Sequence, residues 1–173
     1  MKKGILSLLA VFLFTQINSQ NLTIEETVTY INEELASIGA TDVYGNKIDN
    51  HTYKLTLEDD GYLTLAYIHT VKNNIESQQI IHINDIESIG VDKFSGSVVR
   101  IKCNETNCCR NEDFIEDKIT SRNDLMLKVP YNRSGERIKN ALIHLVSEAK
   151  KTYSTKDPFA PENSDHKMKA TNN

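Results

Sequence analysis

The spacing of hydrophobic residues is helical at the start of the chain, and it predicts one amphipathic helix there. The apolar stripe consists of Ile24, Val28, Ile31, Leu35 and Ile38. Thr23 and Glu26 have the spacing of a capping box, in which each side chain accepts a hydrogen bond from the other residue's free backbone amide. Gly39 is suited to a left-handed C-cap. We therefore expect a helix within residues 20–40 that packs its stripe against the rest of the domain.

From His51 the spacing of apolar residues changes to every second position, which is typical of half-buried strands. Tyr53, Leu55 and Leu57 alternate with polar residues over 51–57. The acidic turn that ends at Gly61 leads into a second β-prone segment, 62–69. These two segments are predicted to form an antiparallel hairpin.

Five more short strands are predicted, each bounded by Asn, Asp, Gly or Pro. They cover residues 78–83, 86–91, 97–103, 108–110 and 125–129. Between residues 111 and 123 the polarity is high and the few apolar residues follow no period, so this segment is predicted to be an irregular insertion.

A second helix is predicted after a turn at 130–135. Its apolar face consists of Ile138, Ala141, Leu142, Leu145, Val146 and Ala149. Lys150 and Lys151 near its end complement the helix dipole. Residues 154–173 show no periodicity and little apolar content, and they are expected to be a disordered tail.

Seven successive strands followed by one helix, over residues 51–153, resemble the pleckstrin-homology-like superfold in the order of elements. The resemblance is carried by three segments, 53–57, 79–86 and 137–145. It implies an α+β domain over 41–153, in which a bent antiparallel barrel or sandwich is closed by its C-terminal helix. The helix within 20–40 is then an addition. The resemblance also implies binding rather than catalysis, although one fold hosts many functions.

The first hairpin of this chain differs from the hairpin of the superfold's phosphoinositide-binding members, which carry a basic patch there. Here the turn contains Glu58, Asp59 and Asp60. Carboxylates repel the phosphates of an inositide headgroup. Phosphoinositide binding is therefore not expected.

The N-terminus has the layout of a cleavable signal peptide. Lys2 and Lys3 precede an uncharged apolar run over 5–14, and such a short basic start is typical of bacterial signals. The run is shorter than the roughly 20 residues that a membrane-spanning helix needs. We expect residues 1–19 to be removed at Ser19, which gives a periplasmic or secreted protein with no transmembrane span.

The chain is acidic, with a formal net charge of -4, and removal of Lys2 and Lys3 makes it more so. It contains no cluster of Lys and Arg of the kind that binds phosphate backbones. Nucleic acids and anionic lipid headgroups are therefore disfavoured. The expected partner is a protein or a small ligand.

Three cysteines lie close together across a predicted turn at 104–107. Cys103 and Cys108 would form a disulfide if they face each other in a hairpin, and pairing of Cys103 with Cys109 is the alternative. A soft-metal site built from these thiols and a histidine is a rival interpretation, although their spacing matches no zinc motif. A nucleophilic cysteine supported by His82 or His144 is another.

The remaining candidate chemistry follows no recognisable motif. The histidines are His51, His69, His82, His144 and His166, and their spacing indicates surface or core roles rather than metal ligation. The acidic turn at 58–60 lacks the rest of a calcium loop, and the chain has neither a phosphate-cradling glycine loop nor a dinucleotide fingerprint.

The sequence therefore predicts no catalytic residue, no metal ligand and no cofactor. It predicts an exported, non-catalytic binding domain. Two alternatives stay open. One is a small extracytoplasmic hydrolase whose site assembles only in the fold. The other is thiol or metal handling by the cysteine cluster.

Overall fold

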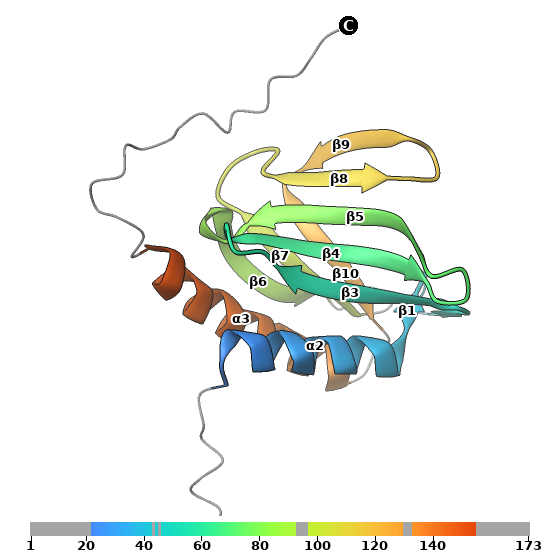
Figure 1. The fold of residues 1–173 in the computed structure, drawn as a ribbon, viewed down its shortest axis with the longest axis horizontal. Coiled ribbons are helices and arrows are strands. Elements are labelled where there is room, and N and C mark those ends of the chain that lie inside the picture. The colour runs from blue at the N-terminus through green and yellow to red at the C-terminus, as the bar shows by residue number, and fades with distance from the viewer. Residues whose placement is uncertain (1–21, 43, 45, 93–96, 130–132, 155–173) are drawn as a thin grey trace, which may run out of the picture.

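The computed structural model describes residues 22–42, 44, 46–92, 97–129 and 133–154, which form an α+β fold (Figure 1). Two helices, α2 (Ile24–Ile38) and α3 (Arg133–Ser154), flank the strands in the sequence. The strands are β1 (Ala40–Thr41), β2 (Lys47–Ile48), β3 (His51–Leu57), β4 (Tyr62–His69), β5 (Asn74–His82), β6 (Ile86–Asp92), β7 (Ser97–Cys103), β8 (Cys109–Asp113), β9 (Lys118–Arg122) and β10 (Asp124–Val129), with a 3-10 turn at Ile83–Asp85. The predicted signal peptide, 1–19, and residues 155–173 of the predicted tail lie outside the described residues.

The N-terminal helix is confirmed, together with its capping box. The Glu26 amide donates to Thr23 Oγ1 at 3.2 Å, and the Thr23 amide donates to Glu26 Oε2 at 2.8 Å. Gly39 ends the helix, and its amide donates to the Leu35 carbonyl at 3.0 Å. Its φ of 69° is positive as expected, but its ψ of -176° is extended rather than left-handed helical. Only glycine adopts this backbone region readily.

The strands form three antiparallel sheets: β3-β4-β5-β8-β9, β10-β7-β6, and the ribbon β1-β2. The predicted first hairpin is confirmed as β3 and β4, with His51 opposite His69 at one end. Glu58, Asp59 and Asp60 form its exposed turn. Among the described residues no sheet closes into a barrel, so the seven-stranded barrel is not confirmed.

The prediction of an irregular segment at 111–123 is wrong. β8 extends to Asp113 and pairs with β9, and Asp113 Oδ1 accepts hydrogen bonds from the amides of Ile115 and Glu116 in the turn. This hairpin lies at the edge of the five-stranded sheet, and Ile115 and Ile119 are exposed. A strand that buries neither face lacks the alternation by which strands are recognised in a sequence.

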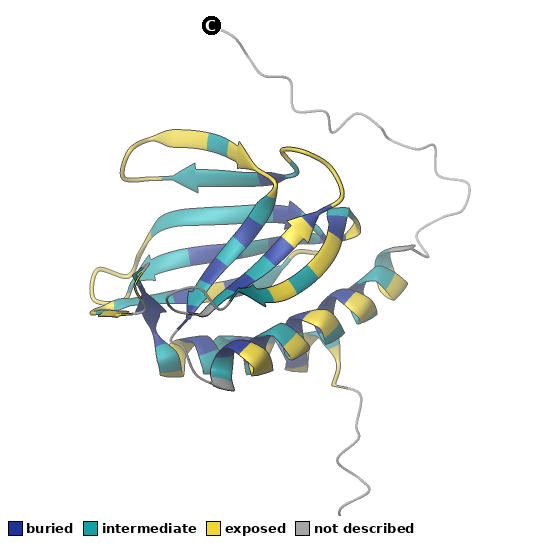
Figure 2. Ribbon diagram, turned by 180° about the vertical axis from the view of Figure 1, so that it is seen from behind, coloured by how far each residue is buried: buried dark blue, intermediate teal, exposed yellow. Residues whose placement is uncertain are grey.

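The two helices lie side by side beneath the sheets, although they stand at opposite ends of the described chain (Figure 1). α2 packs against β3, and α3 packs against β6 and β7. Figure 2 shows buried positions along the side of α3 that faces the sheets. The predicted apolar face of α3 is buried except for Ala141, which is half-buried. The helix begins at Arg133, inside the predicted turn.

Burial of both helix stripes against the strands forms the hydrophobic core. Ile31 and Leu35 of α2 belong to it, together with Ile138, Leu142 and Leu145 of α3. Neither described helix combines the length and the apolar character that a membrane crossing requires.

Candidate functional site

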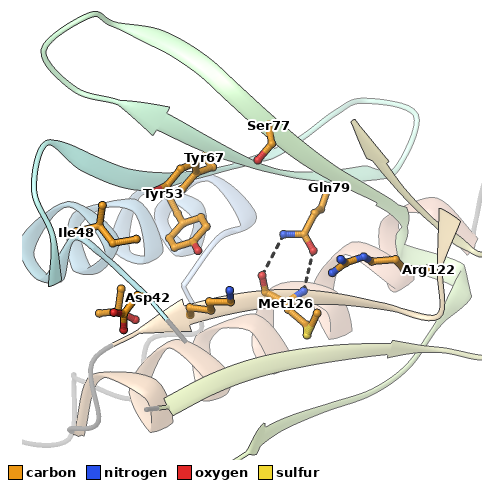
Figure 3. A pocket seen from close by; sticks show the side chains of 10 residues that line it. Asp42, Ile48, Tyr53, Tyr67, Ser77, Gln79, Arg122 and Met126 are labelled. Atoms are coloured by element: carbon orange, nitrogen blue, oxygen red, sulfur yellow. Dashed lines mark hydrogen bonds between the residues drawn. The ribbon is translucent and has the colours of Figure 1, made fainter. Parts of the chain in front are cut away.

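A cavity of about 530 Å³ lies among the five-stranded sheet, β10 and the β1-β2 ribbon (Figure 3). Its lining consists of Thr41, Asp42, Ile48, Tyr53, Tyr67, Ser77, Gln79, Arg122, Met126 and Lys128. The strand period explains this set, because residues two apart share a face. Ser77 and Gln79 come from β5, and Met126 and Lys128 come from β10. Tyr53 and Tyr67 are directly opposite each other on β3 and β4.

Gln79 joins the two larger sheets at the cavity. Its Nε2 donates to the Met126 carbonyl at 3.0 Å, and the Met126 amide donates to its Oε1 at 2.9 Å. The side chain thereby replaces a neighbouring strand for the edge of β10, as the dashed lines in Figure 3 show. Gln79 is therefore a structural clamp rather than a group held ready for a ligand.

Aromatic rings form one wall of the cavity. The ring centroids of Tyr53 and Tyr67 lie 5.3 Å apart, and His51 stacks on Tyr67 at 4.9 Å. Burial raises the pKa of Tyr53 to about 12, the neighbouring Tyr67 adds to the rise, and a hydrogen bond with the Lys128 backbone opposes it. Burial and then the charge of Glu76 raise the pKa of Tyr67. Both side chains are thus neutral phenols at physiological pH.

Several polar groups of the lining have no partner within the described part of the chain. The hydroxyl of Thr41, a residue only 2% exposed, makes no hydrogen bond there. Arg122 and Lys128 make no side-chain hydrogen bond or ion pair with any described residue. The carboxylate of Asp42, by contrast, accepts hydrogen bonds from the amides of Tyr44 and Asn46. The cavity lining therefore carries two cations and one carboxylate, a net positive charge in an acidic protein.

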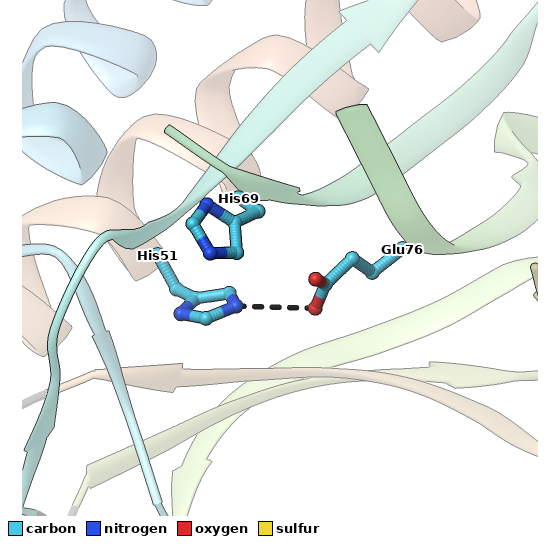
Figure 4. A group of neighbouring side chains, drawn as sticks. All are labelled: His51, His69 and Glu76. Carbon is cyan, nitrogen blue, oxygen red and sulfur yellow. Dashed lines mark hydrogen bonds and ion pairs between the residues drawn. The ribbon is translucent and has the colours of Figure 1, made fainter. Parts of the chain in front are cut away.

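Beside the cavity, His51, His69 and Glu76 form a group that we call the His–Glu cluster (Figure 4). Their ligand atoms all lie within 4.8 Å of one another, and it is the one such potential metal-binding group found among the described residues. His51 Nε2 lies 3.1 Å from Glu76 Oε2. These two side chains are 16% and 14% exposed. The stacked ring of Tyr67 connects the cluster to the cavity wall.

A β-bulge completes the His–Glu cluster. Tyr67 pairs with Ser77 and Ile68 pairs with Ile75, so Glu76 is the extra residue of β5. A bulge turns a side chain out of the regular alternation, and here it brings Glu76 to the face that carries the two histidines. The register of the predicted hairpin could have placed His51 opposite His69. The bulge has no signature in the sequence, which is why the cluster was missed.

The structure brings together the predicted pair, Cys103 and Cys108, but not in the predicted hairpin. The sulfur atoms of Cys103 and Cys108 lie at disulfide-bonding distance, with their Cα atoms 6.2 Å apart. They do not face each other in a hairpin, because β7 and β8 belong to different sheets. The chain crosses from the three-stranded to the five-stranded sheet at this point. The pair therefore ties the two sheets together.

The third thiol, Cys109, is free and fully buried. Burial raises its pKa to about 11, and the charge of Asp124 adds to the rise. A protonated thiol is a poor nucleophile and a poor metal ligand. The histidines that were considered as its helpers have other partners: His82 contacts the Asp60 carbonyl and His144 the Leu22 carbonyl. His166 lies outside the described residues.

No protein-family model matches the chain, and neither a curated protein nor a solved structure is significantly similar to it. The assignment of function therefore rests on the chemistry of the cavity and of the His–Glu cluster.

Proposed function

We propose that this protein is a binding domain for a small organic anion, which it holds in the cavity between its sheets. The observation that carries the proposal is that Arg122 and Lys128 line that cavity without an ion-pair partner among the described residues, together with Thr41, whose buried hydroxyl makes no hydrogen bond there. A buried polar group that makes no hydrogen bond costs about 1–3 kcal/mol. Binding of an anion would supply the missing partners.

The lining also indicates the kind of anion. A guanidinium recognises carboxylate or phosphate through two parallel hydrogen bonds, and a lysine adds a point charge. Tyr53, Tyr67 and Met126 offer apolar and aromatic surface on the remaining walls. The volume is in the range of small-molecule sites. We expect a ligand with one carboxylate or phosphate group attached to a compact apolar or planar body.

Titration calorimetry of the full-length chain with benzoate, phenyl phosphate, citrate and inorganic phosphate tests this proposal. The test variant carries Arg122→Gln and Lys128→Gln. A matched control carries Lys54→Gln and Lys102→Gln, which remove the same charge from exposed positions. We expect the test variant to bind the aromatic anions at least roughly tenfold more weakly than the control, since hydrogen bonds to charged groups contribute about 1.5–3 kcal/mol each. Equal losses in both variants would refute a cavity site, and so would the absence of binding to any probe.

Export of the protein belongs to the same proposal. Cys103 and Cys108 at bonding distance support it, because disulfides persist in oxidising compartments outside the cytoplasm. The likeness to the pleckstrin-homology-like superfold also remains a proposal. It is supported by the order of the elements, a run of antiparallel strands followed by one packed helix.

A hydrolase is the second candidate, and one observation favours it. His51 and Glu76 form a histidine–carboxylate pair beside the cavity, which is an arrangement that general-base catalysis uses. Saturable hydrolysis of p-nitrophenyl acetate or p-nitrophenyl phosphate, lost in His51→Phe, would establish it in place of the binding role. Equal hydrolysis by the wild-type protein and by His51→Phe would exclude this hydrolase site and favour the binding role.

A further inference from the structure

The His–Glu cluster has the composition and the layout of a metal site, and none of its members lines the cavity. We propose that His51, His69 and Glu76 bind one divalent transition-metal ion, for which Zn²⁺ is the best match. This inference is independent of anion binding in the cavity.

The distances suit a small ion. Ligand atoms at about 2.0–2.1 Å from Zn²⁺ in a tetrahedron are roughly 3.3 Å apart. His51 Nε2 and Glu76 Oε2 already lie 3.1 Å apart, and the third ligand atom lies within 4.8 Å of both. Binding therefore requires only a small approach of His69.

The three ligands stand on adjacent strands of one sheet. His51 and His69 are a directly opposite pair on β3 and β4, and Glu76 stands in the bulge of β5. Hydrogen-bonded strands fix the positions of the Cα atoms, so little conformational entropy is lost when the ion binds. All three residues are half-buried, which leaves access for an ion.

The environment of His51 is that of a metal-binding histidine. Its Nδ1 lies 2.8 Å from the Asp49 carbonyl, which can only accept a hydrogen bond, so Nδ1 carries a proton. A ligating histidine generally donates its second N–H to such a group, which fixes the tautomer and raises the basicity of the ligand. Nε2 is then the ligand atom. Any proton that it shares with Glu76 leaves to the solvent when the ion binds.

His69 provides an internal reporter of binding. Its Nδ1 accepts a long hydrogen bond, 3.3 Å, from the Lys72 amide, and its other nitrogen is turned towards His51 (Figure 4). An ion on Nε2 moves the ring proton to Nδ1, so the Lys72 amide loses its acceptor. The amide resonance of Lys72 should therefore shift when the metal is added.

The ligand set favours zinc over the alternatives. Two imidazoles and one carboxylate are ligands of Zn²⁺ in catalytic sites, whereas Ca²⁺ and Mg²⁺ prefer oxygen alone. Three protein ligands leave at least one coordination position for water or another small molecule.

The experiment is a titration of Zn²⁺ into the full-length protein after chelator treatment, followed by calorimetry, with Co²⁺ absorption as a probe of geometry. His51→Phe keeps a ring against Tyr67 but removes the nitrogen, and Glu76→Gln keeps the size but removes the charge. His144→Gln and Glu87→Gln are the matched controls, because both residues lie outside the cluster. We expect one Zn²⁺ per chain, bound roughly tenfold or more weakly by the two cluster variants and unchanged in the controls.

Zinc uptake that is the same in cluster and control variants, or no uptake at all, would overturn the proposal and leave the cluster as a structural ion pair. If the cluster variants do not fold, as circular dichroism would show, the wild-type protein still decides the question. Its nitrogen–proton NMR spectrum should shift at Lys72 on addition of Zn²⁺, and an unchanged Lys72 signal would refute the site. Because the cavity titration uses no metal ion and the zinc titration uses no organic anion, failure of one proposal does not imply failure of the other.

Discussion

The helix-covered side of the protein and the cavity side differ in how completely their polar groups are hydrogen-bonded. Under the helices, Asn32 of α2 reaches the edge of β3: its Nδ2 donates to the Leu55 carbonyl at 2.9 Å, and its Oδ1 accepts from the Leu55 amide at 2.7 Å. Lys150 of α3 donates to the Ile86 carbonyl at 2.8 Å. At the cavity, the side chain of Gln79 forms the same pair of hydrogen bonds with the backbone carbonyl and amide of Met126.

The cavity nevertheless keeps one buried group unsatisfied, the Thr41 hydroxyl, which has no partner in the described part of the structure. The exposed Arg122 and the half-buried Lys128 of the lining have no charged partner there either. Buried polar groups are normally hydrogen-bonded, and exceptions tend to mark functional places. The contrast supports the proposal that the cavity, rather than the helical layer, is the part of this fold that binds a ligand.

The largest expected effect is a loss of stability on the helical side. Leu142, on the buried face of α3, is 2% exposed. Leu142→Ala should lower the free energy of unfolding by about 3 kcal/mol, because apolar burial is lost and a cavity remains. Ile48→Ala in the half-buried cavity wall should cost less than about 1.5 kcal/mol. Urea denaturation measures both losses of stability. Equal losses would show that the helical side and the cavity side contribute alike to stability.

The second-largest expected effect is a fall in the free energy of unfolding at alkaline pH, caused by Tyr53 in the cavity wall. The pKa of Tyr53 is about 12 in the folded protein and about 10 in the unfolded chain, so the folded state retains this proton more strongly. The resulting stability is complete below pH 10 and is lost as the pH rises from 10 to 12, by about 2–3 kcal/mol in total. Tyr53→Phe should flatten the fall in stability over this range. An unchanged slope would mean that burial does not raise this pKa.

Removal of the Asn32 clamp should have an intermediate effect. Asn32→Ala leaves the amide and the carbonyl of Leu55 without partners, and it should cost about 2 kcal/mol. Asn140→Ala on the exposed face of α3 is the control, with a change of no more than about 0.5 kcal/mol. Thermal unfolding of the two variants provides the comparison, and a cost for Asn32→Ala as small as the control's would show that water replaces the clamp.

Two buried threonines give the smallest effects, and they should have opposite signs. Thr27 of α2 is 1% exposed and its hydroxyl donates to the Thr23 carbonyl at 2.7 Å, so Thr27→Val should destabilise by about 1 kcal/mol. Thr41→Val removes a hydroxyl that has no partner among the described residues, so it should stabilise by about 1 kcal/mol while weakening the binding of anions. Chemical denaturation measures the signs, and destabilisation by both substitutions would show that Thr41 is satisfied in solution.

Several elements were predictable because their signals are local in the sequence. The capping box of Thr23 and Glu26 and the apolar stripe of α2 involve neighbours three or four residues apart, and they defined that helix correctly. The alternation in β3 and the turn at Gly61 defined the first hairpin. The apolar face of α3 was predicted for the same reason.

Where the local signal was weak, the prediction failed. β9 is exposed on both faces, so its composition resembled that of a loop. β8 was predicted to pair with β7, whereas it pairs with β5 and β9. Nothing in the sequence near Cys108 indicates that the chain passes from one sheet to another there.

The sequence by itself therefore determined the class of the fold, both helices and the first hairpin, because helical and strand periods are properties of consecutive residues. Only the tertiary structure decided the pairing of the sheets, the cavity that collects Thr41, Arg122 and Lys128, and the bulge that places Glu76 beside the two histidines. These features depend on contacts between residues far apart in the chain, and the register of those contacts is set by the packing of the whole core.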